Sequence, residues 1–400
     1  MLKNIKEKCC GCGACADICP AHIISMQRNE LGFLYPHVDG NKCLNCNLCN
    51  SICPNQKEQK CVWNVGEVEC AYSRDDDLKE KCSSGGIFGE IARVVLRQGG
   101  VCFGAAFDKN FSVRHICVEC EDDLPKILGS KYIQSDTSGI FISVKKKLKD
   151  NKPVLFVGTP CQVAALKYFL NKQYDNLILV DLFCNNVPSP AVWQAWLQHV
   201  SNGRKVTSVN FRDKTEGWDN YSLKIVFDNG EVYRKNKKKD GFLSTFSKGC
   251  YARPSCHSCE YKGFDKVSDL TLGDFQELGI MFPEVDGFRG VSMVRINSQK
   301  GKAIYEMCKG KICTVTVKAE DMDMCHPNIG QPILSHPNRA IFLRKFSEGY
   351  PIQKLLRRYA GIPIRVKVKN ILRNMVKKLG VYYLIKNKSV KQEKKNIRSK

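Results

Sequence analysis

The sequence predicts a protein of mixed α+β and α/β class: a mixed β-sheet with helices, preceded by a small cysteine-rich domain and followed by a basic helical tail. Three observations lead to this prediction. Two cysteine clusters with little hydrophobic periodicity occupy residues 1–60. Strand-like and helix-like segments alternate from residue 68, and short alternating segments typical of antiparallel strands follow residue 205.

Changes in composition divide the chain into five segments. A length of 400 residues suits two or three domains. The predicted segments are a cysteine-cluster domain, two successive parts of a mixed-sheet domain, a helical extension and a basic tail, at residues 1–60, 68–150, 151–325, 326–362 and 363–400.

Buried strands and amphipathic helices are predicted in the first part of the sheet domain. The apolar spacing of GIFGEIARVVLRQGG indicates a helix that stops at its Gly-Gly pair. Ser189 and Pro190 fit the cap and the first position of another helix. In chain order we expect a helix at 86–100, strands at 101–107, 113–120 and 153–157, a helix at 162–170, a strand at 177–183 and a helix from 190.

Strands dominate after residue 205 because polar and apolar residues alternate there. Asp228, Asn229 and Gly230 form a typical hairpin turn between two of these strands. We expect strands at 206–211, 221–227, 231–234, 268–275 and 290–297, and a helix at 300–308.

The formal charge of +23 is concentrated at the C-terminal end. Residues 351–400 hold 16 Lys and Arg and a single acid, Glu393, which gives a net charge of +15. Nucleic-acid binding is excluded because no basic face with interleaved aromatic residues is present. Apolar residues recur at helical spacing between 368 and 382, so the tail is predicted to pack on the body, to lie on an anionic membrane or to bind a partner.

Cysteine usage indicates metal or redox chemistry in a reducing compartment. The chain has 23 cysteines, yet its first residues lack the apolar stretch of a signal peptide and no apolar run long enough to span a membrane is present. Disulfide scaffolds are typical of small secreted domains instead. We therefore expect a cytoplasmic protein, whose basic tail allows peripheral contact with the inner membrane surface.

Two repeats of C-x2-C-x2-C-x3-C-P carry the strongest chemical signal. Three cysteines in such a tight loop bind three irons of one 4Fe-4S cubane, and the fourth reaches the other cluster. Zinc sites pair C-x2-C motifs across a longer gap, so zinc is disfavoured. Cys10 falls outside the spacing and is expected to be unligated. The predicted ligand sets are Cys9, Cys12, Cys15 and Cys53 for one cluster, and Cys43, Cys46, Cys49 and Cys19 for the other.

The glycines between the first cysteines serve the same chemistry. Gly11 and Gly13 let the backbone approach the inorganic sulfurs, where its N–H groups can donate hydrogen bonds. Residues 1–60 resemble the bacterial two-cluster ferredoxins in spacing and in length. Such a module carries electrons and does no organic chemistry, so the rest of the chain is expected to supply a donor or an acceptor.

Further cysteines in the body predict a third metal site. Cys161 and Cys184 each follow a predicted strand, in GTPCQ and LFC, and the loop CHSC provides Cys256 and Cys259. Cys250 competes for one of these places. Zinc is the chemical alternative to a third cluster, and free buried cysteines are the structural one.

Two glycine-rich turns are candidate phosphate sites. SSGGIFG and GTPCQ each open a helix, whose first N–H groups attract anions. Each turn is a weak signal alone, because Gly-Gly before a helix is usually only a turn. Lys131 in GSKY, taken in isolation, indicates a solvated charge.

Seven segments in a fixed order resemble the beta-subunit family of the coenzyme factor-420 (deazaflavin) hydrogenases and dehydrogenases. They are SSGGIFGEIA, GSKYIQS, VGTPCQVAALK, VDLFC, FRDKTEGW, CHSCEYKGFDKVSDLTLGDF and GVSMVRIN, and the likeness spans roughly residues 68–320. The resemblance implies an oxidoreductase with FAD beside a 4Fe-4S cluster, and it includes members fused to an N-terminal two-cluster ferredoxin. Plant hydroxymethyl-chlorophyll reductases resemble another branch, so the family leaves the substrate open.

The resemblance also implies site residues. Lys131 would lie near the isoalloxazine and stabilise its reduced anion, which makes it the catalytic candidate. Asp274 is a weaker candidate, because a buried Asp in a turn is as often a structural cap. His115, His199 and His326 are expected to be packing or surface residues, so no general base is assigned. The implied third-cluster ligands are Cys161, Cys184, Cys256 and Cys259, and the implied FAD contacts are Ser84, Gly85, Gly86, Ser130, Lys131, Gly158 and Thr159.

These observations favour a flavin-dependent iron–sulfur oxidoreductase. Its FAD would pass electrons between the ferredoxin-type clusters and a two-electron substrate, either the deazaflavin coenzyme or another small molecule. One alternative is an electron-transfer subunit that relays electrons to a separate catalytic partner, and another is a metal-binding interaction protein without turnover. The glycine turns favour the enzyme because a simple relay needs no phosphate site. The direction of electron flow stays open.

Overall fold

The computed structural model describes residues 7–56, 67–263, 266–276, 278–282, 285–317 and 330–361. The amphipathic tail, most of the polar connector after residue 56 and His326 lie outside these residues. Among the helices described, none combines the length and apolar character needed to cross a membrane.

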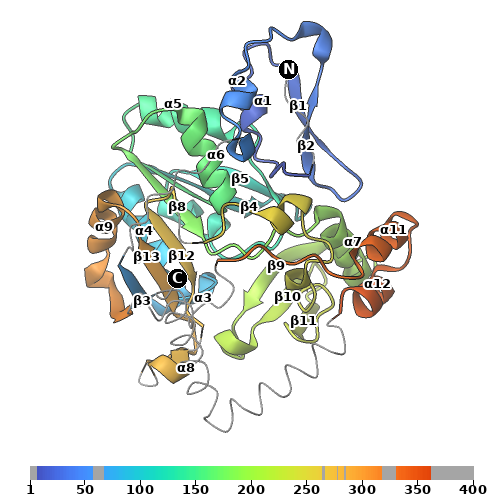
Figure 1. Ribbon diagram of the computed structural model, residues 1–400. Coiled ribbons are helices and arrows are strands. Elements are labelled where there is room, and N and C mark those ends of the chain that lie inside the picture. The colour runs from blue at the N-terminus through green and yellow to red at the C-terminus, as the bar shows by residue number, and fades with distance from the viewer. Residues whose placement is uncertain are drawn as a thin grey trace, which may run out of the picture.

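A large mixed β-sheet forms the centre of the body (Figure 1). Strands β4, β7, β8 and β12 run parallel in its middle, and antiparallel strands extend it on both sides. Every residue of β7 is buried, as expected for a parallel strand that is covered on both faces. In the described part of the chain the spatial order is β14 (Ile312–Val317), β3 (Val68–Ser73), β13 (Ser292–Ile296), β12 (Leu270–Asp274), β8 (Leu177–Leu182), β7 (Val154–Gly158), β4 (Val101–Phe107), β5 (Val113–Val118) and β6 (Ser135–Asp136).

Helices cover both faces of this sheet, which makes a three-layer body (Figure 1). On one face α4 (Ile87–Arg97) and α9 (Gln299–Glu306) pack on the strands, and α3 (Asp76–Lys81) precedes α4. On the other face α5 (Ile140–Lys149) and α6 (Pro160–Leu170) enclose a second apolar cluster. The carboxyl ends of the parallel strands remain free for a site, as is usual in such sheets.

A smaller sheet and three helices surround a separate apolar core. Its strands, in the order β11 (Val232–Asn236), β10 (Ser222–Phe227) and β9 (Val206–Asp213), are antiparallel. The packed helices are α7 (Pro190–Ser201), α11 (Arg339–Ser347) and α12 (Ile352–Tyr359). Trp193, Phe211 and Phe242 lie at the centre of this core, with ring centroids 4.7 to 5.9 Å apart.

The N-terminal domain projects from the body above α5 and α6 (Figure 1). It contains α1 (Ala14–Ile18), an antiparallel hairpin of β1 (Ile24–Arg28) and β2 (Leu34–Val38), and α2 (Leu48–Ser51). Apolar residues of this domain join the α5 and α6 cluster. Polar contacts fix the same interface, since Asp17 accepts a hydrogen bond from Gly139 N at 2.8 Å and Thr137 donates one to Cys12 O at 2.8 Å.

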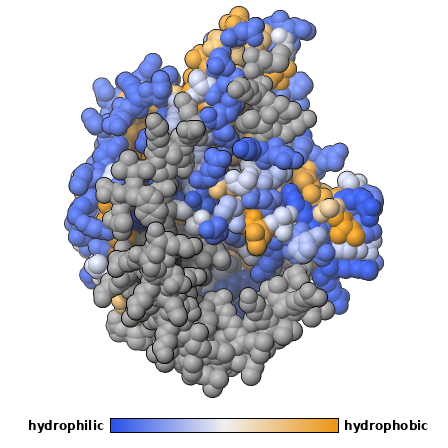
Figure 2. Space-filling view, viewed as in Figure 1, coloured by the Kyte–Doolittle hydropathy of each residue, from blue (hydrophilic) through white to orange (hydrophobic). Residues whose placement is uncertain are grey.

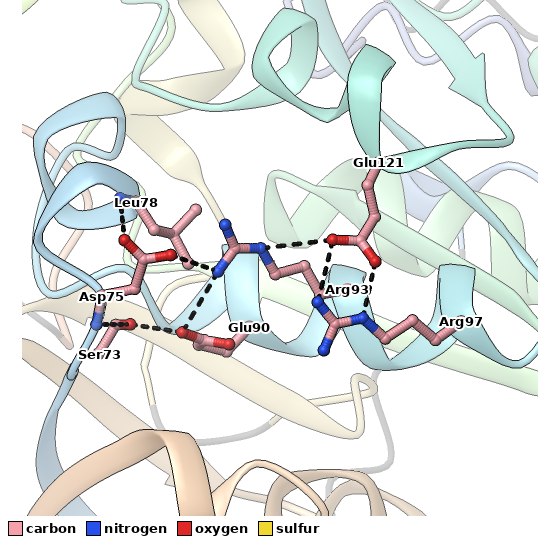
Figure 3. A network of polar contacts seen from close by, with 7 residues as sticks. All are labelled: Ser73, Asp75, Leu78, Glu90, Arg93, Arg97 and Glu121. Atoms are coloured by element: carbon pink, nitrogen blue, oxygen red, sulfur yellow. Dashed lines mark hydrogen bonds and ion pairs between the residues drawn. The ribbon is translucent and has the colours of Figure 1, made fainter.

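A polar network fastens the segment that contains the first glycine-rich turn (Figure 3). The Ser73 hydroxyl donates to the buried carboxylate of Glu90, and Arg93 Nη1 lies 2.7 Å from Asp75 Oδ2. These contacts tie the end of β3 to α3 and α4. The turn at 82–86, which connects α3 to α4, is therefore held at both of its ends.

Most of the predicted elements are present at or near their expected bounds. The helix predicted at 86–100 ends at Arg97, and the strand predicted at 177–183 ends at Leu182. Ser189 caps α7 as predicted, with its hydroxyl accepting from Val192 N at 3.1 Å. Helix α5, strands β3 and β14, and the short helix α8 (Leu278–Met281) are present although no such element is predicted at these positions.

Candidate functional site

The first predicted ligand set lies against the body. We call Cys9, Cys12, Cys15 and Cys53 the inner thiol group. Burial, together with repulsion from Cys9 and Cys53, raises the pKa of Cys15 to about 12. Gly11 and Gly13 adopt positive φ angles, and Gly11 N donates to Cys9 Sγ at 3.4 Å.

The second predicted set lies at the far end of the domain. We call Cys19, Cys43, Cys46 and Cys49 the outer thiol group, and all four line one small cavity. Cys46 is exposed, and the side chains of Leu44 and Leu48 beside it are 66% and 41% exposed. The outer set therefore surrounds one cavity, and the division of the eight cysteines into two ligand sets stays a prediction.

A third thiol group lies at the carboxyl ends of two parallel strands. Cys161 follows β7 at the start of α6, and Cys184 follows β8, which pairs with β7. Both line a small cavity with Cys256, Cys259 and Cys10. Cys10 lies between the inner and third thiol groups, since its thiol contacts both Cys12 and Cys161. Its ligation state stays a prediction.

Cys250 does not join the third group. It is completely buried in the core beside α7 and α11, and its thiol donates to Tyr359 O at 3.8 Å. The expectation that Cys250 competes for a ligand position is therefore wrong. The chain turns after Cys250, and the 3-10 helix Pro254–Ser258 carries Cys256 back toward the sheet.

The chemistry of the third group fits an iron–sulfur cluster. Burial raises the pKa of Cys256 to about 12 and raises the pKa of Cys184 well above its usual value. Thiolates gathered in such a place need a positive centre to compensate them, which a cluster supplies. Within the described residues, no group of three or more His, Cys, Asp or Glu side chains is arranged to hold a metal ion.

A cavity of about 1520 Å³ adjoins the third thiol group. Cys10, Cys161 and Cys184 line both cavities. Of the sequence-predicted cofactor residues, those that line the large cavity are Ser84, Gly86, Ser130, Lys131, Gly158 and Thr159. It therefore collects residues from both glycine-rich turns and from the GSKY segment.

The first glycine-rich turn is built from residues with different tasks. Gly86 precedes α4 with a φ of 86°, in the left-handed region. Gly85 lies behind the cavity wall, where its N–H donates to Ser292 Oγ at 3.0 Å and a Cβ would approach Ala71 O to 2.5 Å. The Ser84 hydroxyl donates to Val291 O at 2.7 Å. The turn is therefore shaped by close packing against β3 and β13.

The second glycine-rich turn is fixed by a capping box. Thr159 caps α6, and its N–H and hydroxyl both lie 3.0 Å from Gln162 Oε1. Gly158 ends β7, and a Cβ there would lie 3.1 Å from Phe156 and Gln162. The N-terminus of α6 is thus held rigidly between the large cavity and the third thiol group.

Lys131 is a half-buried residue on the cavity wall. Its Nζ donates to Leu128 O at 2.7 Å and to Lys126 O at 3.2 Å. Burial lowers the pKa of Lys131 to about 7 because the ammonium group loses its water. Lys131 is therefore not the freely solvated charge that GSKY suggests in isolation, because its ammonium group is held by two backbone carbonyls.

Two parts of this chain match known protein families. Residues 8–57 match the family described as 4Fe-4S dicluster domain. Residues 151–321 match the family described as the C terminus of the coenzyme F420 hydrogenase/dehydrogenase beta subunit. The chain is thus similar, in two separate stretches, to a 4Fe-4S dicluster domain and to the C terminus of this beta subunit.

Two further comparisons complete this picture. A chain of the xenon-derivatised F420-reducing NiFe hydrogenase complex from Methanosarcina barkeri is similar over 74% of this chain and 93% of that chain, with 20% sequence identity and a TM-score of 0.43. No curated protein matches the chain.

A buried ion pair between residues 212 and 274 is one that the sequence does not predict. Arg212 Nη1 lies 2.6 Å from Asp274 Oδ2, and its guanidinium stacks 4.3 Å from the ring of Tyr221. Arg212 Nε and Nη2 are buried without a hydrogen-bond partner, and the whole side chain is 4% exposed on the cavity wall. Arg212 lies in FRDKTEGW, one of the seven segments that carry the family resemblance. The resemblance could therefore have indicated this arginine.

The histidines serve packing or lie at the surface. His115 is buried, stacks on Phe156 with centroids 5.4 Å apart and contacts Ser135 Oγ and Val157 O. Burial lowers the pKa of His115 to about 4, so its ring is neutral. His199 is exposed on α7. Asp274 is engaged by Arg212, which makes it a structural partner rather than a free carboxylate.

Proposed function

We propose that this chain is a flavin-dependent iron–sulfur oxidoreductase. It would pass electrons between the clusters of its dicluster domain and a two-electron substrate, by way of a third 4Fe-4S cluster and FAD. The substrate would be the deazaflavin coenzyme or another small molecule. The proposal deepens the coarser statement that the comparisons support, namely an iron–sulfur protein of an oxidoreductase family.

One observation carries the proposal: the third thiol group and the large cavity share a wall. Cys161 and Cys184 contribute to both. A cofactor in the large cavity would therefore lie beside a cluster held by these thiols. A simple relay between proteins has no use for a cavity of about 1520 Å³ next to its last cluster.

The residues of this wall suit a flavin dinucleotide. Gly86 and Thr159 place the N-termini of α4 and α6 at the cavity, and such termini attract phosphate groups. Ser130 extends the polar part of the wall, with its hydroxyl 2.7 Å from that of Ser83. When bound, FAD supplies the conversion between one-electron and two-electron chemistry.

Lys131 would stabilise negative charge in the cavity. Its ammonium group is fixed by two backbone carbonyls, so it needs no reorganisation when an anion forms beside it. A neighbouring anion favours the protonated lysine and counteracts the lowering of its pKa by burial. The residue thus matches the catalytic role that the family resemblance implies.

Other cavity residues favour an anionic, planar substrate. Arg212 offers two unpartnered guanidinium nitrogens, and Tyr221 and Trp218 offer aromatic faces on the same wall. Lys237 lies between these rings, at 4.5 Å from the Tyr221 centroid. Cations and aromatic faces together bind flat rings that carry carboxylate or phosphate groups.

The positions of the thiol groups suggest the order of the relay. The outer group is exposed and suits exchange with a partner protein. The inner group lies next to the third group through the contact of Cys10 with Cys12 and Cys161. Electrons would move along the line from outer to inner to third cluster and into the cavity, or in reverse.

Cofactor analysis of anaerobically purified protein tests this proposal. We expect about twelve irons, an equal amount of acid-labile sulfide and one FAD per chain. About eight irons without flavin would overturn the proposal and leave an electron-transfer subunit that serves a separate catalytic partner. A matched Cys184→Ala variant should lose about four irons and keep the two N-terminal clusters.

A further inference from the structure

One buried arginine connects the body to the inner thiol group. Arg253 precedes the loop that carries Cys256, and its side chain is 1% exposed. Its Nε donates to Cys9 O at 2.6 Å, and its Nη2 donates to Leu34 O at 2.8 Å. The guanidinium also lies 4.3 Å from the ring of Tyr35. A residue of the body thus reaches into the dicluster domain.

The positive charge of Arg253 has no negative partner among the described residues. None of their carboxylates forms an ion pair with it, and Nη1 is buried without a hydrogen-bond partner. An arginine side chain keeps its charge in a protein. A charge removed from water in this way carries a large free-energy cost unless an anion compensates it. An anion that binds at this place would supply that compensation.

The position of the unpartnered Nη1 of Arg253 indicates on which side of the guanidinium that anion would lie. Nη1 would lie 2.8 Å from a Cβ built on Gly11, so it faces the loop that carries the inner thiol group. The backbone of Arg253 also contacts the third group, because Cys256 N donates to Arg253 O at 3.0 Å. Cys10, which contacts Cys12 and Cys161, lies in the same junction. Two sites for anionic clusters thus meet at one cation.

We propose that Arg253 is the shared counter-charge of the inner and third clusters and raises the reduction potentials of both. A thiolate-ligated cubane is an anion, and reduction makes it more negative, so a fixed cation favours its reduced form. Hydrogen bonds to cluster sulfurs act in the same direction. Arg253 is a positioning residue. The part of this proposal that concerns the third cluster rests on the proposed function.

Redox titration of an Arg253→Met variant, monitored by EPR, tests the proposal. The reduction equilibrium of the inner cluster should shift about tenfold toward the oxidised form, which is 59 mV for a one-electron couple. The third cluster should shift in the same direction. The outer cluster serves as an internal control with an unchanged potential. Arg204→Met is the matched control, since Arg204 also donates to backbone carbonyls but lies in the smaller-sheet region.

A conservative variant separates charge from structure. Arg253→Lys keeps the cation and loses the two fixed carbonyl bonds, so its cluster potentials should stay close to those of the unaltered protein. Unchanged potentials in a fully iron-loaded Arg253→Met protein would overturn the proposal. Equal shifts of all three clusters would also overturn it, because they would indicate a general loss of structure.

Pulsed EPR of the unaltered protein covers the case in which the methionine variant does not fold. Protein labelled with 15N-arginine should show a nitrogen hyperfine coupling on the reduced inner cluster, and its absence would contradict the proposal. This test also separates the two proposals. If the third cluster is missing, the proposed function fails, whereas the coupling of Arg253 to the inner cluster is still measured.

Discussion

The inner and outer thiol groups have the same sequence spacing and opposite surroundings. The inner group is pressed against α5 and α6, and Arg253 binds the carbonyl of its first cysteine. The outer group lies at the tip of the domain, where Figure 2 shows apolar side chains gathered on the surface and Leu44 is 66% exposed. Two repeats of one motif therefore perform different tasks because the rest of the chain covers only one of them.

The difference gives the dicluster domain a direction. A cluster buried at an interface exchanges electrons with what lies across that interface, and an exposed cluster exchanges them with a visiting protein. The exposed leucines beside the outer group fit a weak docking surface, since transient redox complexes bury little area.

Loss of the inner cluster should harm the protein more than loss of the outer one. Cys12→Ser and Cys46→Ser should each remove about four irons. Cys12 is buried in the interface with α6, so its variant should also lower the unfolding midpoint by about 5 °C or more, while Cys46→Ser lowers it little. Differential scanning calorimetry with iron analysis checks this. Equal midpoints would contradict the division.

The proposed electron path from the inner cluster ends in the large cavity, where Lys131 lies on the wall. Removal of this lysine should slow reduction of the flavin. Lys131→Ala should reduce the rate of flavin reduction about 100-fold, measured by anaerobic stopped flow. The pKa of Lys131 is lowered to about 7, so it is charged below that pH. The rate should therefore fall as pH rises through this region.

A charge-preserving variant provides the control for that prediction. Lys131→Arg keeps its charge at all these pH values. Its rate should stay high and lose the pH dependence. If Lys131→Ala retains the pH profile of the unaltered protein, this lysine is not the titrating group.

The exposed leucines at the tip of the domain, beside the outer group, should affect only the interaction with a partner protein. Leu44→Asp combined with Leu48→Asp should raise the KM for a reduced ferredoxin donor about tenfold, equivalent to about 1.4 kcal/mol. Iron content and cluster EPR spectra should not change. Met307→Asp, at an equally exposed apolar residue after α9, is the control and should leave the KM unchanged. A matching rise in that control would refute a docking role for the tip.

Substitution of Cys10, whose thiol lies between the inner and third thiol groups, should have the smallest effect on iron content. Cys10→Ala should retain about twelve irons, because Cys10 lies between two ligand sets without belonging to either. Cys250→Ala should do the same, since Cys250 belongs to an apolar core. Iron and sulfide analysis checks both. A loss of four irons in either variant would make that cysteine a ligand.

The sequence predicts local features of this molecule well and its long-range junctions poorly. Spacing alone assigns the eight N-terminal cysteines to two groups, since a tight loop and a short helical turn determine which sulfurs meet. Strand ends place Cys161 and Cys184 together because β7 and β8 are parallel neighbours. These arrangements depend on residues close together in the chain or on simple sheet rules.

Other features depend on contacts between distant residues. Arg253 and Cys9 are 244 positions apart, and Arg212 and Asp274 are 62 apart. Nothing in the local pattern shows which repeat the body covers. Cys250 and Cys256 occur in one short stretch, yet a tight turn sends one to an apolar core and the other to the thiol cavity. Tertiary packing decided these cases.

Rapid-freeze EPR with a reduced ferredoxin donor tests the order of the relay most directly. The comparison uses the unaltered protein and a Cys46→Ser, Cys49→Ser variant that lacks the outer cluster. We predict that in the unaltered protein the outer cluster is reduced first, followed by the inner cluster and then the flavin. In the variant, reduction of the inner cluster and of the flavin should be strongly delayed. Reduction of the flavin at the unaltered rate without the outer cluster would contradict the account.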